Sequence, residues 1–513
     1  MRRIVFPLLG LLLGAGATRG EDLSEAEQRG RAFYRTGVAA DGAEVLARLA
    51  GGGAEVPAAT LPCSSCHGWD GRGRPEGSVE PSNITWAELT KPYEVGGGRS
   101  RKRPPYDERL LKRAITLGVD SAGQPLTAVM PRYQLTHEQA ADLVSYLKRL
   151  EGERDPGVGD EELVLGVVLP AEPAAARAVE TLLTTSFERV NQAGGVFGRR
   201  LRLASLAASA GGDAQAEALE RFVGAEKPFA LVAPHLSGAE QEVADLCGRL
   251  GLPAVGAAAA DPALEGRGSR YVFYLTPGPT ALVGALADWW KKHQPTGRKL
   301  LVVEGNGEGQ AWTRELVGRL GPAAETEVLS LAVGVSVAAV PARAREMGAT
   351  AVVLLATGEE GAAVFDALAA LPELPLLAPG VVAARLLVAG DGSRRGKVIT
   401  TLPVIPQDLD PKILPAVGAL AGISDPRSPG FLEARSAFAA VNLLLEGLRR
   451  VGRDLRREKL VEALETIYEL PTGVMQPLGY GPTRRVGVGS VWAVEVDLAT
   501  GQPVGEPELL PIQ

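Results

Sequence analysis

The sequence predicts a multidomain protein in which a loop-rich N-terminal domain precedes a larger two-lobed α/β domain. Residues 22–150 are rich in loops and charged side chains, whereas residues 151–162 are acidic and contain Gly and Pro without apolar periodicity. From Leu163 onward, short apolar strands alternate with amphipathic helices. The middle stretch has the composition of a linker. Strand–helix alternation is typical of parallel sheets covered by helices on both faces. Residues 163–513 are too long for one doubly wound sheet, so two lobes are expected.

The elements of the α/β domain follow from apolar runs and the residues that interrupt them. The first strand is a continuous apolar run, and the first helix ends before Gly194-Gly195, a pair suited to a helix C-cap. Strands are expected at 163–169, 200–206, 229–233, 253–256, 300–304, 326–331 and 351–356, and helices between them at 174–192, 214–223, 237–250, 312–320 and 341–347.

The N-terminus has the three parts of a secretory signal peptide. Arg2 and Arg3 precede an apolar run at 4–13, and Ala15-Gly16-Ala17 offers the small residues of a cleavage site. The apolar run is much shorter than the roughly 20 residues that a membrane-spanning helix needs. We therefore expect residues 1–17 to be a cleaved signal peptide and the protein to be periplasmic, with no transmembrane segment in the mature chain.

Composition excludes one large class of function. The formal net charge is −7 and is spread along the chain, so the basic excess of a nucleic-acid-binding protein is missing. Of the three cysteines, Cys247 lies on an apolar helical face with Val243, Leu246 and Leu250, and we expect it to be a buried core thiol.

Cys63-Ser-Ser-Cys66-His67 is the attachment signature of a c-type haem. Two thiols three positions apart can reach the two vinyl groups of one porphyrin, and the following imidazole can bind the iron. A structural zinc site would need four ligands, yet the only other histidine in this half of the chain is His137. A thioredoxin-like pair would lie between a strand and a helix, whereas this motif lies in a loop rich in Pro and Gly. We therefore predict one covalent haem c.

The sixth iron ligand must come from elsewhere in the chain. Met130 is followed by Pro131, which restricts the backbone of a ligand loop, and histidine–methionine ligation is common in electron-transfer haem proteins. We predict that the iron is bound by His67 and Met130. The alternative is His137, for which an exposed place in the first turn of a helix capped by Thr136 is expected instead.

The residues around the motif fit a known family. The matching stretches are Gly30-Arg-Ala-Phe33-Tyr34, Cys66-His67-Gly68, Gly71-Arg-Gly73, the methionine loop at 126–133 and Ala140-Asp-Leu-Val-Ser-Tyr146-Leu147. Residues 26–150 thereby resemble class I cytochromes c. The resemblance implies an all-α domain, electron transfer to a redox partner, and a Gly30 that lets the first and last helices cross closely. One departure is the stretch of about thirty residues between the first helix and Cys63, longer than in the simplest members.

A second family resemblance covers the α/β domain. It rests on Val190-Asn-Gln-Ala-Gly-Gly-Val-Phe-Gly-Arg199, Val232-Ala-Pro-His-Leu-Ser-Gly238, the stretch 253–262 and Asn306-Gly-Glu-Gly-Gln310. Residues 163–505 thereby resemble type I periplasmic binding proteins of the leucine/isoleucine/valine family. The resemblance implies two lobes joined by a hinge, with a small-molecule ligand in the cleft between them.

At the positions that bind the ligand in that family, this sequence has different residues. Ser237 matches a serine that binds an amino-acid carboxylate, but the expected hydroxyl side chains after Pro253 are replaced by alanines, including Ala258 and Ala260. Glu308 stands where an aromatic residue is expected, and no acidic match for the ammonium-binding residue is found near Pro379-Gly380. Unpaired buried charge is costly, so we expect the ligand not to be an ordinary amino acid. No catalytic constellation is apparent in this domain, and no enzymatic activity is expected.

Together these features predict a periplasmic electron-transfer protein in which a haem domain is fused to a small-molecule-binding domain. Two alternatives remain open. The chain is a solute-binding or sensing protein of an ABC-transporter type system with the haem as a redox input, or it is an electron-accepting subunit of a quinoprotein dehydrogenase. The redox partner would accordingly be a quinoprotein dehydrogenase or another cytochrome.

Overall fold

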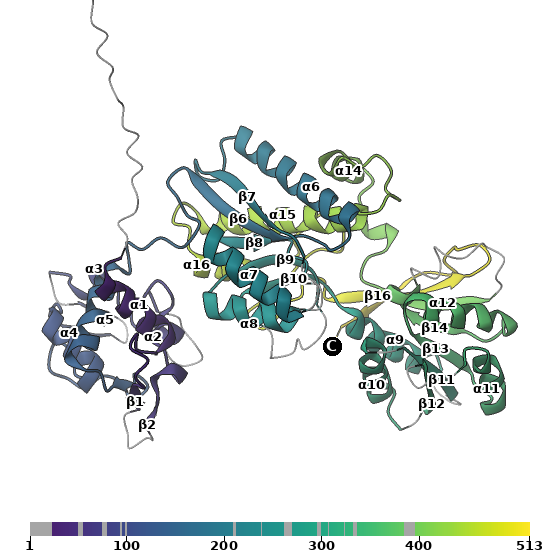
Figure 1. The fold of residues 1–513 in the computed structure, drawn as a ribbon, viewed down its shortest axis with the longest axis horizontal. Coiled ribbons are helices and arrows are strands. Elements are labelled where there is room, and N and C mark those ends of the chain that lie inside the picture. The colour runs from purple at the N-terminus through teal and green to yellow at the C-terminus, as the bar shows by residue number, and fades with distance from the viewer. Residues whose placement is uncertain are drawn as a thin grey trace, which may run out of the picture. The chain divides into compact units, whose positions relative to one another are not determined.

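The computed structural model describes residues 23–49, 55–73, 80–92, 95–97, 100–208, 212–236, 239–260, 269–294, 299–305, 307–322, 324–331, 336–383 and 396–512. The expected signal peptide and Ser237 lie outside the described residues. The chain divides into two compact units, Met1–Glu153 and Arg154–Gln513 (Figure 1). Within the described part of the chain, no helix is both long and apolar enough to cross a bilayer.

The N-terminal unit is mainly helical, as the all-α prediction requires. Its helices are α1 (Glu25–Thr36), α2 (Cys63–His67), α3 (Trp86–Leu89), α4 (Glu108–Leu117) and α5 (His137–Arg149). Short strands are added to them: β1 (Leu46–Arg48), β2 (Glu55–Pro57) and β5 (Arg132–Tyr133) form one antiparallel sheet, and β3 (Val95–Gly97) pairs with β4 (Ser100–Arg103).

The crossing of α1 and α5 organises this unit. A Cβ atom on Gly30 would lie 2.1 Å from the backbone oxygen of Asp142, so only glycine permits the observed approach. Next to the crossing, the rings of Tyr34 and Tyr146 lie 5.5 Å apart, and Arg29 forms an ion pair with the Asp142 carboxylate at 2.7 Å. The role predicted for Gly30 is therefore confirmed.

The first lobe of the C-terminal unit is built on a five-stranded parallel sheet in the order β10-β9-β8-β6-β7. The C-terminal helices return to this lobe and share its apolar core. Its strands are β6 (Glu162–Val168), β7 (Arg200–Leu206), β8 (Ala230–Val232), β9 (Ala254–Ala260) and β10 (Val272–Pro277), and its helices are α6 (Pro173–Gln192), α7 (Gly212–Glu226), α8 (Glu240–Leu250), α14 (Leu414–Ala421), α15 (Phe431–Val451) and α16 (Arg457–Glu465).

The second lobe has its own seven-stranded sheet and its own apolar core. The order is β12-β11-β13-β14-β15-β16-β17, in which the first five strands are parallel and the last two are antiparallel to their neighbours. Its strands are β11 (Lys299–Glu304), β12 (Glu325–Ser330), β13 (Ala351–Leu355), β14 (Leu376–Pro379), β15 (Lys397–Leu402), β16 (Ser490–Asp497) and β17 (Glu508–Pro511), and its helices are α9 (Pro279–His293), α10 (Glu308–Leu320), α11 (Ala339–Met347) and α12 (Gly358–Ala367).

The chain passes between the two lobes three times, after β10, after β15 and before β16 (Figure 1). One side chain links two of these connections. The Gln476 amide donates to the backbone oxygens of Pro403 at 2.8 Å and Ser490 at 3.2 Å, and its oxygen accepts from the Ser490 hydroxyl at 2.8 Å.

The predicted order of a helical domain followed by a two-lobed α/β domain is confirmed. Each of the strands and helices expected between 163 and 356 is present, with ends that shift by a few residues. The largest shifts are of four residues, since β9 continues to Ala260 instead of ending at 256 and α10 begins at Glu308 instead of 312. Part of the expected linker packs on the C-terminal unit, since the Asp155 carboxylate accepts from the backbone N–H of Arg457 at 2.5 Å.

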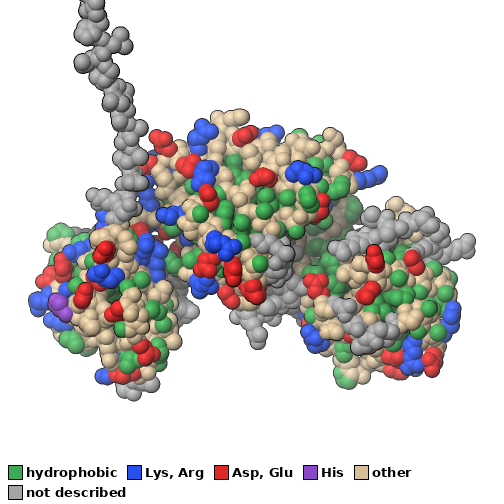
Figure 2. Space-filling view, in the orientation of Figure 1, with side chains coloured by type: hydrophobic (Ala, Val, Ile, Leu, Met, Phe, Trp, Pro, Cys, Tyr) green, Lys and Arg blue, Asp and Glu red, His purple; other side chains and the backbone are tan. Residues whose placement is uncertain are grey.

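Charges are mixed over the surface of the C-terminal unit. On the face seen in Figure 2, Lys and Arg side chains are interspersed with Asp and Glu, and no broad field of one sign covers either lobe.

Candidate haem site and ligand cleft

The attachment motif forms a single turn of helix. Helix α2 follows the extended Pro62 and ends at Gly68, whose φ of 73° reverses the chain. Because α2 places residues three and four positions apart on one face, Cys66 and His67 lie on the same side as Cys63. All three cysteines belong to the described residues, and none forms a disulfide.

The imidazole of His67 is buried and held in one orientation. Its Nδ1 lies 2.9 Å from the backbone oxygen of Ser82. A carbonyl only accepts, so Nδ1 carries the proton and donates, which leaves the lone pair of Nε2 available for a metal ion. Burial lowers the pKa of His67 below its ordinary value, so the ring is neutral at pH 7, as a ligand must be. Among the described residues, none forms a hydrogen bond with Nε2.

The turn after the motif positions Ser82. The backbone N–H of Gly73 donates to the oxygen of His67 at 2.9 Å, and that of Ile84 donates to the oxygen of Gly71 at 2.7 Å. A Cβ on Gly73 would lie 2.1 Å from the backbone oxygen of Pro81. The two glycines therefore bring the segment that contains Ser82 back over the imidazole.

The surroundings of Cys63 disfavour a thioredoxin-like redox pair. Desolvation by burial raises the pKa of its thiol to about 12, whereas a redox-active pair needs a thiol whose pKa is lowered. In the part of the chain that the structure describes, no group of three or more His, Cys, Asp or Glu residues is placed to hold a metal ion. The residues instead fit a covalent haem, with two thiols one turn apart and an oriented neutral imidazole beside them.

Met130 is half-buried in the loop between α4 and β5. The Arg132 guanidinium holds this loop by donating to the backbone oxygens of Leu126 at 3.1 Å, Thr127 at 3.2 Å and Met130. Space for the guanidinium exists only because residue 118 is glycine, where a Cβ would lie 1.6 Å from Arg132 Nε. His137, the alternative ligand, is exposed at the start of α5, where the Thr136 hydroxyl caps the helix as predicted.

In the C-terminal unit, the candidate ligand residues lie at the carboxyl ends of the parallel strands, where ligands bind in open α/β sheets. Ala258 is half-buried within β9, and its carbonyl accepts from the Thr276 hydroxyl at 2.9 Å. Ala260 is the last residue of β9, and Glu308 is the exposed first residue of α10. Strand β9 thus continues beyond the expected end at 256 and includes these alanines.

Two families match these two units. Residues 170–502 match the periplasmic binding protein family, and residues 53–151 match the cytochrome c family. The chain belongs to the periplasmic binding protein family. Its N-terminal unit is a cytochrome c domain, so both resemblances read from the sequence are confirmed. No curated protein sequence matches the chain.

Solved structures agree on the fold of the binding-protein unit. A leucine-binding protein from Thermotoga maritima aligns with a TM-score of 0.53 and 16% identity over 68% of this chain and 98% of its own. A fatty acid ABC transporter substrate-binding protein from Thermomonospora curvata gives 0.53 and 16% over 70% and 94%. A solute-binding protein of an ABC transporter from Rhodopseudomonas palustris, in complex with 3,4-dihydroxybenzoic acid, gives 0.52 and 16% over 68% and 97%. At this identity the likeness shows the fold alone.

Residues that sequence reasoning missed lie at the same edge of the binding-protein unit. His235 follows β8, and burial lowers its pKa to about 4, so the ring is neutral. Glu304 is the buried last residue of β11, and Glu359 and Glu360 open α12 after β13. Their position at strand ends is the signal that could have identified them, once the strands were assigned.

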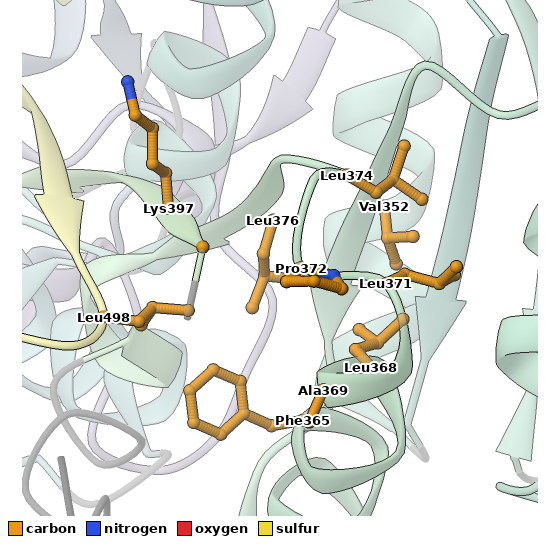
Figure 3. A pocket seen from close by; sticks show the side chains of 11 residues that line it. Val352, Phe365, Leu368, Ala369, Leu371, Pro372, Leu374, Leu376, Lys397 and Leu498 are labelled. Atoms are coloured by element: carbon orange, nitrogen blue, oxygen red, sulfur yellow. The ribbon is translucent and has the colours of Figure 1, made fainter. Parts of the chain in front are cut away.

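A separate hollow in the second lobe lies at the opposite edge of its sheet. It is lined mainly by apolar side chains such as Phe365, Leu368 and Pro372 (Figure 3). Leu376 and Lys397 also line it, and they are the first residues of β14 and β15. Because it lies at the amino ends of these strands, it is not the cleft that binding proteins of this family use.

Proposed function

We propose that the chain is a periplasmic electron-transfer protein that holds one haem c covalently and carries a small-molecule-binding domain. The observation that supports this most strongly is helix α2, on which two cysteines one turn apart precede an imidazole oriented by the Ser82 carbonyl at 2.9 Å. When bound, a haem iron supplies one-electron exchange between its ferrous and ferric states.

Within this proposal each residue has one task. Cys63 and Cys66 attach the haem, His67 binds the iron through Nε2, and Met130 supplies the sixth ligand. Ser82 fixes the imidazole ring, and Arg132 holds the loop of Met130 by its backbone. The expected signal peptide would direct the chain to the compartment where the periplasmic binding proteins act.

The proposal is tested on the exported full-length protein. We expect one haem per chain from the absorbance of its pyridine complex, a reversible one-electron potentiometric titration, and a mature N-terminus that begins after residue 17. An apoprotein that is soluble and folded when produced with haem-attachment machinery would contradict the proposal. His67→Ala is the matched variant, because it keeps both thiols and removes only the proposed iron ligand.

For the binding-protein unit we propose a neutral or cationic small molecule, with an aromatic ring as the favoured class. The carboxyl edge of the second lobe carries Glu304, Glu308, Glu359 and Glu360, and like charges would repel an anion there. The Rhodopseudomonas palustris relative in complex with 3,4-dihydroxybenzoic acid supports the aromatic ring alone, since the carboxylate of that ligand is the group that these glutamates would repel. Titration calorimetry should detect benzyl alcohol and not leucine.

In a second candidate function, solute binding is the main task of the protein, and the haem is a redox input to an ABC-transporter type system. The fold relatives that are ABC-transporter substrate-binding proteins favour it. The two candidates differ in one measurable respect. If binding is primary, the ligand affinity of the ferrous and ferric proteins should differ, and by linkage the ligand should shift the midpoint potential. Equal affinities in the two states would favour electron transfer with an independent binding unit.

A further inference from the structure

The segment inserted between α1 and Cys63 has a definite structural partner. We call residues 38–49 and 55–60, the described part of this stretch, the inserted segment. Its strands β1 and β2 pair with each other (Figure 1). Strand β1 also pairs with β5, which begins two residues after Met130. The inserted segment and the methionine loop therefore share one antiparallel sheet.

Backbone and side-chain bonds join the two segments. Ala47 pairs with Tyr133 and Arg48 with Arg132 in the β1–β5 register, and Ala47 is fully buried. The backbone N–H of Gln134 donates to the oxygen of Leu46 at 2.9 Å. The Gln134 side chain also donates to the Glu55 carboxylate at 2.7 Å.

Tyr133 connects the same loop to the haem-attachment motif. Its side chain is 3% exposed, and its hydroxyl donates to the backbone oxygen of Leu61 at 2.5 Å, two residues before Cys63. Its ring meets that of Phe33 in α1 edge to face at 5.7 Å. A single buried side chain thus contacts the first helix and the approach to the motif.

Most residues between 121 and 129 are exposed, so the loop that leads to Met130 has few apolar contacts of its own. A loop of this kind opens at low cost unless its ends are held. The Arg132 guanidinium holds the loop by hydrogen bonds to three of the loop's own backbone carbonyls. The C-terminal end of the loop is held by the β1–β5 pairing and by the hydrogen bond from Tyr133 to Leu61.

We propose that the inserted segment and Tyr133 are positioning elements that hold the Met130 loop at a fixed place relative to helix α2, so that exogenous ligands displace the methionine less readily. This inference rests on the proposed role of Met130 as the sixth ligand. A ligand that is held in position before binding loses less conformational freedom when it binds, which favours it over a competitor from solution.

The test is competition by imidazole for the sixth position of the ferric full-length holoprotein. Tyr133→Phe removes the hydroxyl bond to Leu61 and keeps the ring against Phe33. We expect imidazole to bind roughly five- to tenfold more tightly to this variant, the effect of losing one buried hydrogen bond. Tyr146→Phe is the control, because it removes a 2.7 Å hydroxyl bond to Glu153 in the same domain but outside the loop.

The readouts separate positioning from general destabilisation. Both Tyr→Phe variants should lower the melting temperature, but only Tyr133→Phe should change imidazole affinity. Unchanged affinity in Tyr133→Phe, or an equal change in Tyr146→Phe, would overturn the inference. Glu55→Ala tests the inserted segment without a buried substitution, because it removes the exposed bonds of Glu55 to Gln134 and Arg48, and it should tighten imidazole binding roughly twofold. Unchanged affinity in Glu55→Ala would overturn the role of the inserted segment.

Failure of the underlying function looks different. If Met130→Ala leaves the ferric spectrum unchanged, the methionine is not the sixth ligand, and the positioning inference is overturned together with that assignment while covalent attachment at helix α2 stands. If Met130→Ala changes the spectrum while Tyr133→Phe leaves imidazole affinity unchanged, only the positioning inference is overturned.

Discussion

The haem site and the ligand cleft differ in how far apart in the sequence their residues lie. Cys63, Cys66 and His67 belong to one helical turn, so their spacing alone fixes which face they share. The cleft candidates come from the ends of separate strands, such as β9 for Ala258 and β11 for the region of Glu308. A site whose residues belong to one helical turn can be predicted from the sequence. A site whose residues come from several strands can be predicted only when the register of the strands is known.

The predictions that follow test this contrast, from the largest expected effect to the smallest. Met130→Ala should remove the weak red charge-transfer band expected of methionine-ligated ferric haem and lower the midpoint potential, because methionine ligation raises it. His137→Ala is the control and should leave both unchanged, since His137 is exposed at the start of α5. An unchanged spectrum in Met130→Ala would contradict the prediction, made from the sequence, that Met130 is the sixth ligand.

Gly30→Val tests whether the haem site depends on a distant helix crossing. The new side chain would meet the backbone of Asp142, where even a Cβ lies at 2.1 Å, so the helices must separate. We expect about 3 kcal/mol of lost stability in the cytochrome domain, measured by denaturant unfolding. Gly152→Ala, whose Cβ would have only one neighbour at 3.6 Å, should change it by less than about 0.5 kcal/mol.

His235 gives the binding-protein unit a predicted dependence on pH. Its pKa in the folded state is about 4, below the ordinary 6.5, because burial disfavours the charged ring. Between these values the unfolded state binds more protons, so stability is complete above about pH 6.5 and falls as the pH is lowered toward 4, by about 3 kcal/mol at most. His235→Gln should flatten this part of the profile in calorimetry of the full chain. An identical profile in the variant would show that the ring is solvated.

The smallest effect concerns charge selection in the cleft. Benzyl alcohol and benzoate share a ring and differ in a negative charge. Glu308→Gln should improve benzoate binding about fivefold while leaving benzyl alcohol nearly unchanged, the size expected for one exposed charge. Leucine binding at micromolar concentration that is lost in Ser237→Ala would contradict this account. It would mean that the domain still recognises amino acids and that its ligand-binding positions were aligned wrongly with those of the family.

Much of the fold was predictable because apolar runs report directly on buried strands. The strand and helix pattern between 163 and 356 is present as expected, but β10 and α9 were missed, although Pro279 at the first position of α9 is a start signal. The return of α14, α15 and α16 to the first lobe could not be read at all. The sequence of a single helix does not indicate which of the two apolar cores the helix packs against.

Several residues that support the haem site could not be predicted from the sequence for the same reason, because their roles depend on contacts between distant segments. The motif identified the attachment residues, but Ser82 contributes only a backbone oxygen, which any residue could supply. Arg132 acts through carbonyls of its own loop, in a space opened by Gly118. The partner of the inserted segment could not be known before β1 was seen beside β5.

The measurement that tests the central claim most directly is acid–acetone extraction of the denatured exported protein, followed by its intact mass. The account predicts that the haem stays with the chain, that the mass exceeds that of the mature polypeptide by one haem, and that a Cys63→Ala, Cys66→Ala double variant releases it into the solvent. Complete release of haem from the unsubstituted protein would contradict covalent attachment at helix α2.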